Sequence, residues 1–223
     1  MLNYTLTQAP PNMLVVEVES AYNDTVKYGN MTLHIDPLFK PTEHAKIYGN
    51  VVAVPRGKCY SEEGVEIDPI VRVGDKVYFH YLTTNDEANC IYGNFYRLPY
   101  FWAFCVVRDG RIIPVGAWTL CEEIIEEEGE FTEVEVSSQK INAIVSASGL
   151  VTGIAKKSST RYAKLKHLGE LLSNQKTLDV SVNDVVVLAP NSHFRNEIEG
   201  KSYYTVRQGD ILGKMEVPPP SQI

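Results

Sequence analysis

The sequence contains no long hydrophobic run. None of its apolar stretches approaches the ~18 consecutive residues that a membrane-spanning helix requires, although the chain has 223 residues. Its N-terminus, MLNYTLTQAPPN, has no basic segment followed by an apolar one, which a secretory leader would show. We therefore expect a cytoplasmic protein that has no membrane partner.

Basic residues are also too few for a typical nucleic-acid-binding protein. The chain has 21 Lys and Arg residues against 28 Asp and Glu residues, which gives a formal net charge of −7. Proteins that bind nucleic acid usually carry a basic field, so we expect no nucleic-acid partner. The basic stretch from Lys156 to Lys166 contains a single aromatic residue, Tyr162, whereas single-strand-binding surfaces interleave several.

Motifs for catalysis and metal binding are absent from the sequence. Its cysteines stand at positions 59, 90, 105 and 121, so no CxxC pair indicates a zinc or thioredoxin-type site. The histidines are isolated, and there is no GxGxxG fingerprint, GxSxG elbow or P-loop. We expect no enzyme activity, no metal and no cofactor.

The sequence also predicts where single reactive side chains lie. The apolar surroundings of Cys105 and Cys121 predict core positions, and His80 is expected on the surface.

Short segments rich in β-branched and aromatic residues dominate the chain. Each is bounded by Gly, Pro, Asn or Asp, as is typical of strands. They cover residues 14–18, 49–54, 71–79, 95–98, 103–107, 111–115, 118–122, 184–188, 203–207 and 211–216. Many short strands at this spacing predict an all-β fold of the sandwich or barrel type.

Two local patterns add to this prediction. Asp109-Gly110 lies between two strand segments and predicts a tight hairpin, because a type I′ turn needs positive φ at both central positions. Residues 160–172 form the one candidate helix, with a strand and its turn as the alternative.

Two pairs of segments indicate an internal repeat. Residues 71–79 are similar to residues 180–188, an offset of 109, and residues 93–98 to residues 201–206, an offset of 108. The alternative is that any two strand segments look alike. A repeat divides the chain into two domains, residues 1–110 and residues 111–223.

Three segments resemble the GroES-type co-chaperonin family, the chaperonin-10-like proteins. Gly49–Val54 is similar to the family's GxVVAVG strand, and Val71–Phe79 to its V-K-V-G-D-x-V-x-F strand. Tyr203–Gly213 is similar to the closing D-I-L element. The resemblance extends over residues 13–107 and 111–215, with greater specificity in the first half. It implies an all-β chain of two GroES-like β-barrels in tandem.

The resemblance implies a non-catalytic function. Such proteins cap a GroEL-type chaperonin and assist ATP-dependent folding of an unfolded client protein enclosed in its cavity. They form homo-oligomeric rings, and each barrel binds the chaperonin through a mobile loop that displays a short apolar segment. A tandem chain would contribute an even number of barrels to its ring.

Each copy contains a stretch that corresponds to this loop, at residues 19–47 and 136–160. The segments that best match the docking segment are small apolar groups next to glycine or serine. These expected chaperonin-binding residues are Met31, Thr32 and Leu33 in the first copy and Leu150 and Val151 in the second. The alternative is that both segments are ordinary strands whose apolar side chains belong to the core.

Two stretches of the chain are acidic. Residues 122–135 contain eight glutamates and no Lys or Arg, which predicts a solvated edge or a mobile segment. Lys58–Asp68 corresponds to the dome loop of the family. A different class of function stays open: a structural or protein-interaction β-barrel protein, for example of phage origin, that no longer binds a chaperonin.

Overall fold

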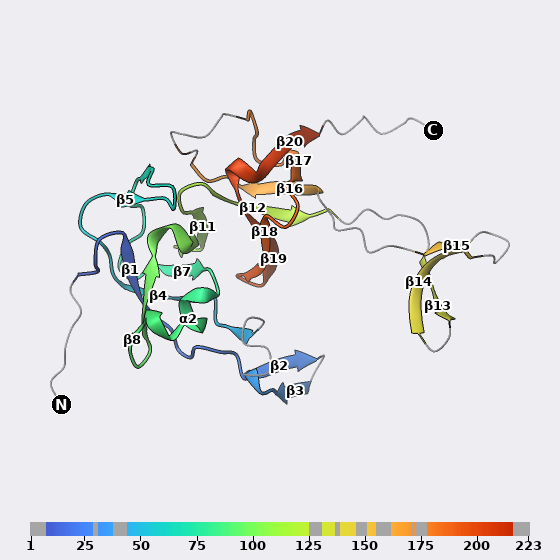
Figure 1. Cartoon of the computed structure of the whole chain (residues 1–223), viewed down its shortest axis with the longest axis horizontal. Coiled ribbons are helices and arrows are strands. Elements are labelled where there is room, and N and C mark those ends of the chain that lie inside the picture. Colours follow the sequence, from blue (N-terminus) through green and yellow to red (C-terminus); the bar gives the residue numbers. More distant parts are fainter. Residues whose placement is uncertain are drawn as a thin grey trace.

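The computed structural model describes residues 8–28, 31–37, 44–124, 131–136, 139–145, 151–154, 162–170, 172 and 178–215. Strands account for most of the regular structure and all their pairings are antiparallel within these ranges (Figure 1). The predicted all-β class is therefore confirmed. None of the helices described is both long and apolar enough to span a bilayer.

The first large sheet has the strand order β11-β10-β7-β4-β1-β9-β8. Its strands are β1 (Met13–Glu17), β4 (Tyr48–Ala53), β7 (Lys76–Phe79), β8 (Cys90–Tyr92), β9 (Phe95–Pro99), β10 (Ala103–Arg108) and β11 (Arg111–Pro114). Alternate residues of these strands enter one core, in which Leu14, Val16, Val77, Phe79 and Leu98 are almost fully buried.

The second large sheet has the strand order β18-β19-β12-β16-β17-β20. Its strands are β12 (Trp118–Glu123), β16 (Tyr162–His167), β17 (Val185–Leu188), β18 (His193–Ile198), β19 (Lys201–Arg207) and β20 (Ile211–Met215). The helix considered over residues 160–172 is wrong and its alternative, a strand, is confirmed, because β16 occupies residues 162–167. Ala163 and Leu165 are buried while Lys164 and Lys166 are more exposed, which is the period of two of a strand.

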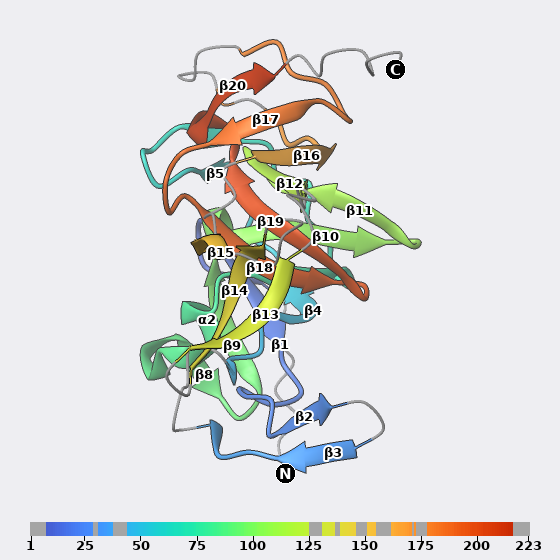
Figure 2. The same ribbon diagram turned by 90° about the vertical axis from the view of Figure 1, so that its right-hand side faces the viewer.

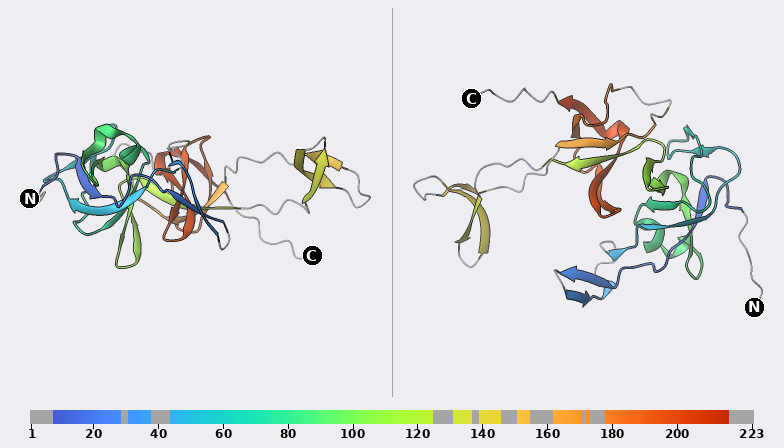
Figure 3. Two further views of the ribbon diagram at one scale, coloured as in Figure 1. Left: turned by 90° about the horizontal axis from the view of Figure 1, so that it is seen from below. Right: turned by 180° about the vertical axis from the view of Figure 1, so that it is seen from behind.

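Three smaller sheets and several short helical turns complete the description. The sheets are formed by β2 (Thr25–Tyr28) with β3 (Met31–His34), β5 (Cys59–Tyr60) with β6 (Glu66–Ile67), and β13 (Phe131–Val136) with β14 (Gln139–Val145) and β15 (Val151–Ile154). The helical turns are α2 (Leu82–Asn85), η2 (Glu87–Asn89), η3 (Tyr100–Trp102) and η4 (Gln208–Asp210). Figure 3 shows the β2–β3 hairpin and the β13–β14–β15 sheet outside the two large sheets.

The two large sheets repeat one topology. The order β8-β9-β1-β4-β7-β10 in the first corresponds strand by strand to β18-β19-β12-β16-β17-β20 in the second. A 3-10 turn precedes β10 in the first sheet and β20 in the second, namely η3 and η4. Each sheet also receives an insertion between its first two strands in the sequence, the β2–β3 hairpin in one and β13–β15 in the other. In the described ranges each sheet begins and ends on a different strand, so no closed barrel is found.

An aspartate turn before β7 is repeated before β17. Gly74 and Asn183 both have positive φ, 90° and 78°, and each precedes the aspartate of the turn. The Asp75 carboxylate accepts a hydrogen bond from the Arg72 backbone N–H at 2.8 Å. Asp184 accepts the same bond from Ser181 at 2.7 Å. The Gly-Asp and Asn-Asp pairs of the sequence therefore have one role, because both residue types tolerate the left-handed conformation.

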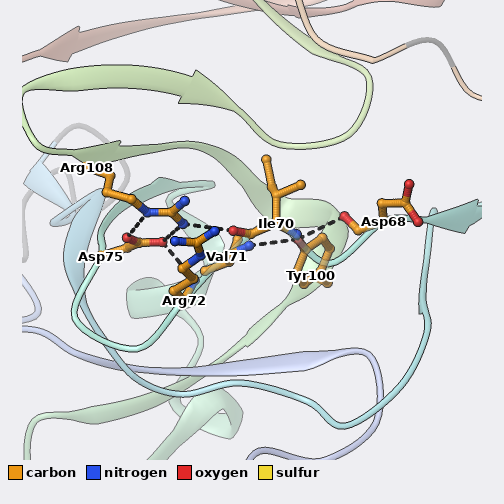
Figure 4. Close-up of polar contacts among 7 residues, drawn as sticks. All are labelled: Asp68, Ile70, Val71, Arg72, Asp75, Tyr100 and Arg108. Atoms are coloured by element: carbon orange, nitrogen blue, oxygen red, sulfur yellow. Dashed lines mark hydrogen bonds and ion pairs between the residues drawn. The ribbon is translucent and has the colours of Figure 1, made fainter.

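The Asp75 carboxylate is buried and joins three segments (Figure 4). Arg108 of β10 donates to both carboxylate oxygens, from Nε at 2.8 Å and from Nη2 at 2.6 Å. The same Nη2 also donates to the Ile70 carbonyl at 2.8 Å, and the Ile70 N–H donates to the Tyr100 hydroxyl at 2.9 Å. Burial alone would raise the pKa of Asp75, but the bonds from Arg108 and Arg72 hold this pKa below its usual value.

The predicted hairpin at Asp109-Gly110 is confirmed, and it changes where the second half begins. Both residues have positive φ, 51° and 72°, and Arg108 pairs with Arg111 across the turn. Strand β11 consequently belongs to the first sheet, although it lies in residues 111–223, which were expected to form the second copy. The second sheet opens instead at β12.

Replacing Asp75 by Asn should lower the free energy of unfolding by about 1–3 kcal/mol at neutral pH, because Arg108 loses its charged partner. Urea denaturation measures this change. Asp184→Asn is the matched control: its partner, Lys214 at 2.8 Å, is more exposed than Arg108, so a smaller loss is expected.

Acid should reduce the effect of Asp75→Asn. Because the folded pKa of Asp75 is lowered, its carboxylate contributes stability above the unfolded pKa of 3.8, and this contribution disappears as the pH falls through the folded pKa. A difference between the variant and the parent chain that persists unchanged below both pKa values would contradict this account.

Candidate functional site

The insertion between β1 and β4 carries the expected docking segment of the first copy. Its two arms run side by side at their base, where the Asn23 N–H donates to the His44 carbonyl and the Lys46 N–H to the Ala21 carbonyl, each at 2.8 Å. Figure 2 shows β2 and β3 at the end of this insertion, at the bottom of the view. The base thus positions the hairpin at the margin of the first sheet.

The apolar residues of this hairpin face solvent. Met31 is 59% exposed and Leu33 is 49% exposed, and they lie two positions apart on one face of β3. The neighbouring residues Thr32 and His34 are also exposed, on the other face. The alternative that Met31 and Leu33 are core residues of an ordinary strand is therefore wrong.

The same segment is more regular than the sequence suggested. Where a mobile loop was expected, β2 and β3 form an antiparallel ladder, with Val26 opposite Leu33 and Tyr28 opposite Met31. The β-branched and aromatic residues of Thr25–Tyr28 favour this strand. An apolar pair is consequently displayed on a hairpin with a defined register.

Helix α2 ties the base of the insertion to the first sheet. The Tyr22 hydroxyl donates to Asn85 Oδ1 at 3.1 Å, and the Thr84 hydroxyl donates to the Lys46 carbonyl at 2.8 Å. Sequence reasoning missed α2, which has four residues and too short a pattern for helical periodicity. A weak signal was Asp86, whose side chain accepts a bond from the Ala88 N–H at 2.9 Å and caps the following turn.

The second insertion, β13–β15, occupies the corresponding place between β12 and β16. Val151 is the first residue of β15 and pairs with Val145 of β14. Leu150 lies outside the described residues, so its placement in a docking segment stays a prediction. Part of the glutamate-rich stretch belongs to β12 and β13, which are strands rather than a mobile segment.

The two halves of the chain share an apolar contact that the sequence did not reveal. One buried cluster contains Tyr78 and Cys105 of the first half with Leu120, Ile198 and Tyr203 of the second. Burial raises the pKa of the Cys105 thiol far above its usual value, so this cysteine is an inert core group, as predicted. The burial of Cys121 is confirmed as well.

Aromatic rings continue this contact between the halves. The Phe104 ring lies 4.7 Å from that of Trp118 and 5.7 Å from that of Phe194. His80 packs edge-on against Phe194 at 4.8 Å and stacks on Tyr81 at 4.5 Å. The expectation that His80 is a surface residue is thus wrong, because it is half-buried among these rings.

Charged groups lie around the apolar contact. Glu199 of the second half accepts bonds from Lys76 Nζ at 2.6 Å and from the Tyr78 hydroxyl at 2.9 Å. Arg207 forms an ion pair with Glu62 at 2.7 Å and lies over the Trp118 ring. The acidic stretch that corresponds to the dome loop is therefore connected to the second half and partly neutralised by it.

Among the residues that the structure describes, no group of three His, Cys, Asp or Glu side chains could hold a metal ion. What the arrangement provides chemically is an exposed apolar hairpin, a second insertion at the equivalent place and a tight contact between two similar sheets. These features suit binding to other proteins.

Comparison with known protein families agrees with this assessment. Residues 132–215 match the model of the chaperonin 10 Kd subunit family, a span that runs from β13 to β20. This match supports a GroES-like domain in this part of the chain. The sequence resemblance was more specific in the first half, whereas the match covers the second. No curated protein matches the sequence.

Lowering the pH should weaken the contact between the halves through His80. Its folded pKa is lowered from 6.5 by burial and by nearby Arg207, and its Nδ1 accepts a bond from the Leu82 N–H at 3.3 Å. Below pH 6.5 the unfolded chain therefore binds the extra proton more readily, so stability falls as the pH decreases until it passes the folded pKa.

The variant His80→Asn keeps an acceptor at this position but cannot titrate. We expect thermal unfolding scans between about pH 7 and pH 5 to show a smaller decrease in stability for this variant than for the parent chain. His167 and His193, whose pKa values are also lowered by burial, should keep part of the dependence. An unchanged slope in His80→Asn would contradict the assignment.

Proposed function

We propose that this protein is a co-chaperonin built from two GroES-like barrels in tandem, which caps a GroEL-type chaperonin and assists ATP-dependent protein folding. The observation that carries the proposal is the match of residues 132–215 to the chaperonin 10 Kd subunit family. The proposed role is non-catalytic and needs no bound cofactor. It places the protein in the cytoplasm, with an unfolded client enclosed in the chaperonin cavity.

The repeated topology supports a second GroES-like copy in the first half. The two sheets share their strand order, and both contain a positive-φ residue and an aspartate before the corresponding strand. Backbone bonds at this turn are repeated too: the Val51 N–H donates to the Asp75 carbonyl, and the Leu165 N–H to the Asp184 carbonyl, each at 2.9 Å. Unrelated strands would not reproduce these details together.

The exposed hairpin supports docking through Met31 and Leu33. Two apolar side chains on one face of β3 can enter an apolar groove while Thr32 remains at its rim. One such contact is weak, and several contacts on one ring act together through their high effective concentration. Leu150 and Val151 are the proposed contact of the second copy, on an insertion at the equivalent position.

One observation favours the other class of function. The β2–β3 segment is a paired hairpin, whereas the family resemblance implies a mobile loop that becomes ordered on binding. A hairpin with a fixed register also suits a structural or protein-interaction protein that has lost its chaperonin. Binding to a chaperonin therefore decides between the two functions.

The deciding experiment is co-elution of the full chain with a purified GroEL-type chaperonin, with ATP, with ADP and without nucleotide. We expect binding only with nucleotide, and a loss of at least about tenfold in affinity for Met31→Ser/Leu33→Ser, because two exposed apolar anchors are removed. His34→Gln, on the face of β3 opposite Met31 and Leu33, is the control and should bind like the parent chain. Failure of the folded parent chain to bind under every condition would favour the alternative function.

The contribution of the second insertion can be measured in the same way. Leu150→Ser/Val151→Ser should weaken binding, and its combination with Met31→Ser/Leu33→Ser should weaken it further, since the two sites act on one assembly. Full binding by the Leu150→Ser/Val151→Ser chain would show that the second copy does not dock through these residues.

A further inference from the structure

A cleft lies where the first half of the chain meets the second. Its volume is about 400 Å³, which is the size of small-molecule sites in proteins. Four of its lining side chains carry aromatic rings, those of His80, Trp102, Trp118 and Phe194. Two of these rings come from each half, and they include both tryptophans of the chain. The cleft therefore exists only while the halves are joined.

The rings pack on one another and leave part of their surface uncovered. The His80 ring lies 5.5 Å from that of Trp102 and 4.8 Å from that of Phe194. The Phe194 and Trp118 rings are 6.2 Å apart. Of the four, His80, Trp102 and Phe194 are only partly buried. Aromatic surface at a cleft attracts either an apolar molecule or a cation, so the charges around it determine which of the two is favoured.

The charged side chains of the cleft add up to a negative charge. They are Glu62, Arg207 and Asp210. Arg207 is already compensated, because it forms ion pairs with Glu62 at 2.7 Å and with Glu63 at 3.9 Å. Burial and the nearby Arg207 lower the pKa of His80, so this ring is neutral at neutral pH. The cleft consequently favours a cation over an anion.

Asp210 carries the negative charge that these ion pairs leave over. Its side chain is partly buried, at the end of η4. In the part of the chain that the structure describes it makes no hydrogen bond, and its interactions are electrostatic ones with Arg207 and Glu63. Burial raises the pKa of this carboxyl group, although Arg207 lowers it. A cation in the cleft would offset the cost of burying the Asp210 charge.

The protein already places a cation on one ring of the cleft. The Arg207 guanidinium lies over the Trp118 ring, 5.2 Å from its centroid, which is within the range of a cation–π interaction. Among the described residues no cation lies over the ring of Trp102 or Phe194. These two partly exposed rings are therefore available to a ligand.

We propose that the cleft binds a small organic cation, an alkylated ammonium group whose carbons contact the Trp102 and Phe194 rings while its charge faces Asp210. Such a weakly hydrated cation fits better than a metal ion, because the cleft offers aromatic rings rather than a set of oxygen ligands. The inference goes beyond the proposed function, since it concerns a site between the halves and holds whether or not a chaperonin binds.

Intrinsic fluorescence tests the inference directly, because both tryptophans line the cleft. Titration of the full chain with choline and with tetramethylammonium, at constant ionic strength, should give a saturable change. The neutral analogue of choline, in which carbon replaces the nitrogen, has the same shape and should bind at least about tenfold more weakly. Both indole N–H resonances should shift in the same titration, which would locate the cation at the cleft.

Two variants test the residues of the site. Asp210→Asn removes the charge but keeps the shape of the side chain, and it should weaken choline binding at least about tenfold. Trp102→Leu removes one ring and should also weaken binding, as measured by the Trp118 indole resonance. Asp109→Asn is the matched control: it removes the same charge from the β10–β11 turn, where a φ of 51° suits Asn, and should bind choline like the parent chain.

Circular dichroism of each variant verifies that it is folded. The absence of a saturable change with either ammonium ion, equal binding of the neutral analogue, or unchanged affinity in folded Asp210→Asn would each overturn the proposal. Co-elution of Asp210→Asn with the chaperonin is a separate measurement, and we expect it to equal that of the parent chain. A failure of the proposed function would therefore be distinguished from a failure of this inference.

Discussion

The carboxylate of Asp75 is the group on which the arrangement of the first half depends. An aspartate that is 4% exposed must be compensated, since an unpaired buried charge is strongly destabilising. The backbone of its own turn and the Arg108 side chain on another strand compensate the charge of this carboxylate. These bonds fix the relative positions of the turn, β7 and β10. The backbone of the same turn extends this to β4, because the Gly74 N–H donates to the Val51 carbonyl at 2.8 Å. The second half repeats the device with Asp184 and Lys214, in a more exposed form.

The contact between the two halves depends on the positions of β7 and β10. Once β7 and β10 are fixed, Tyr78, Phe104 and Cys105 present a continuous apolar face, and Leu120, Phe194 and Tyr203 cover it. At its margin the Trp118 indole N–H donates to the Phe101 carbonyl at 2.9 Å, and Lys76 Nζ donates to Glu199 at 2.6 Å. Such a contact, apolar at its centre and hydrogen-bonded at its rim, resembles an interface between subunits more than a linker between independent domains. The natural unit of this protein is therefore the joined pair of sheets.

Sequence reasoning recovered the features that depend on local chemistry. Most strands, the Asp109-Gly110 hairpin and the burial of Cys105 and Cys121 follow from residue types and their alternation. It failed where contacts between distant segments determine the secondary structure or the burial of a residue. The pattern of Tyr162–His167 fits a helix or a strand, and its pairing with Glu122 and neighbouring residues of β12 determines that it is a strand. His80 was expected on the surface because Phe194, whose ring packs against it, is over a hundred positions away in the sequence. Met31 and Leu33 were identified from a family resemblance, but only the structure shows their exposure.

The difference between the two insertions has a consequence for the symmetry of any closed assembly. One half of each chain displays the β2–β3 hairpin and the other displays the β13–β14–β15 sheet, at equivalent places in the topology. Because the peptide chain links the halves, every chain carries the two kinds of insertion in equal number and in a fixed order. Two separately made subunits would mix at random instead. Covalent fusion thus guarantees the stoichiometry and the order of two distinct insertions.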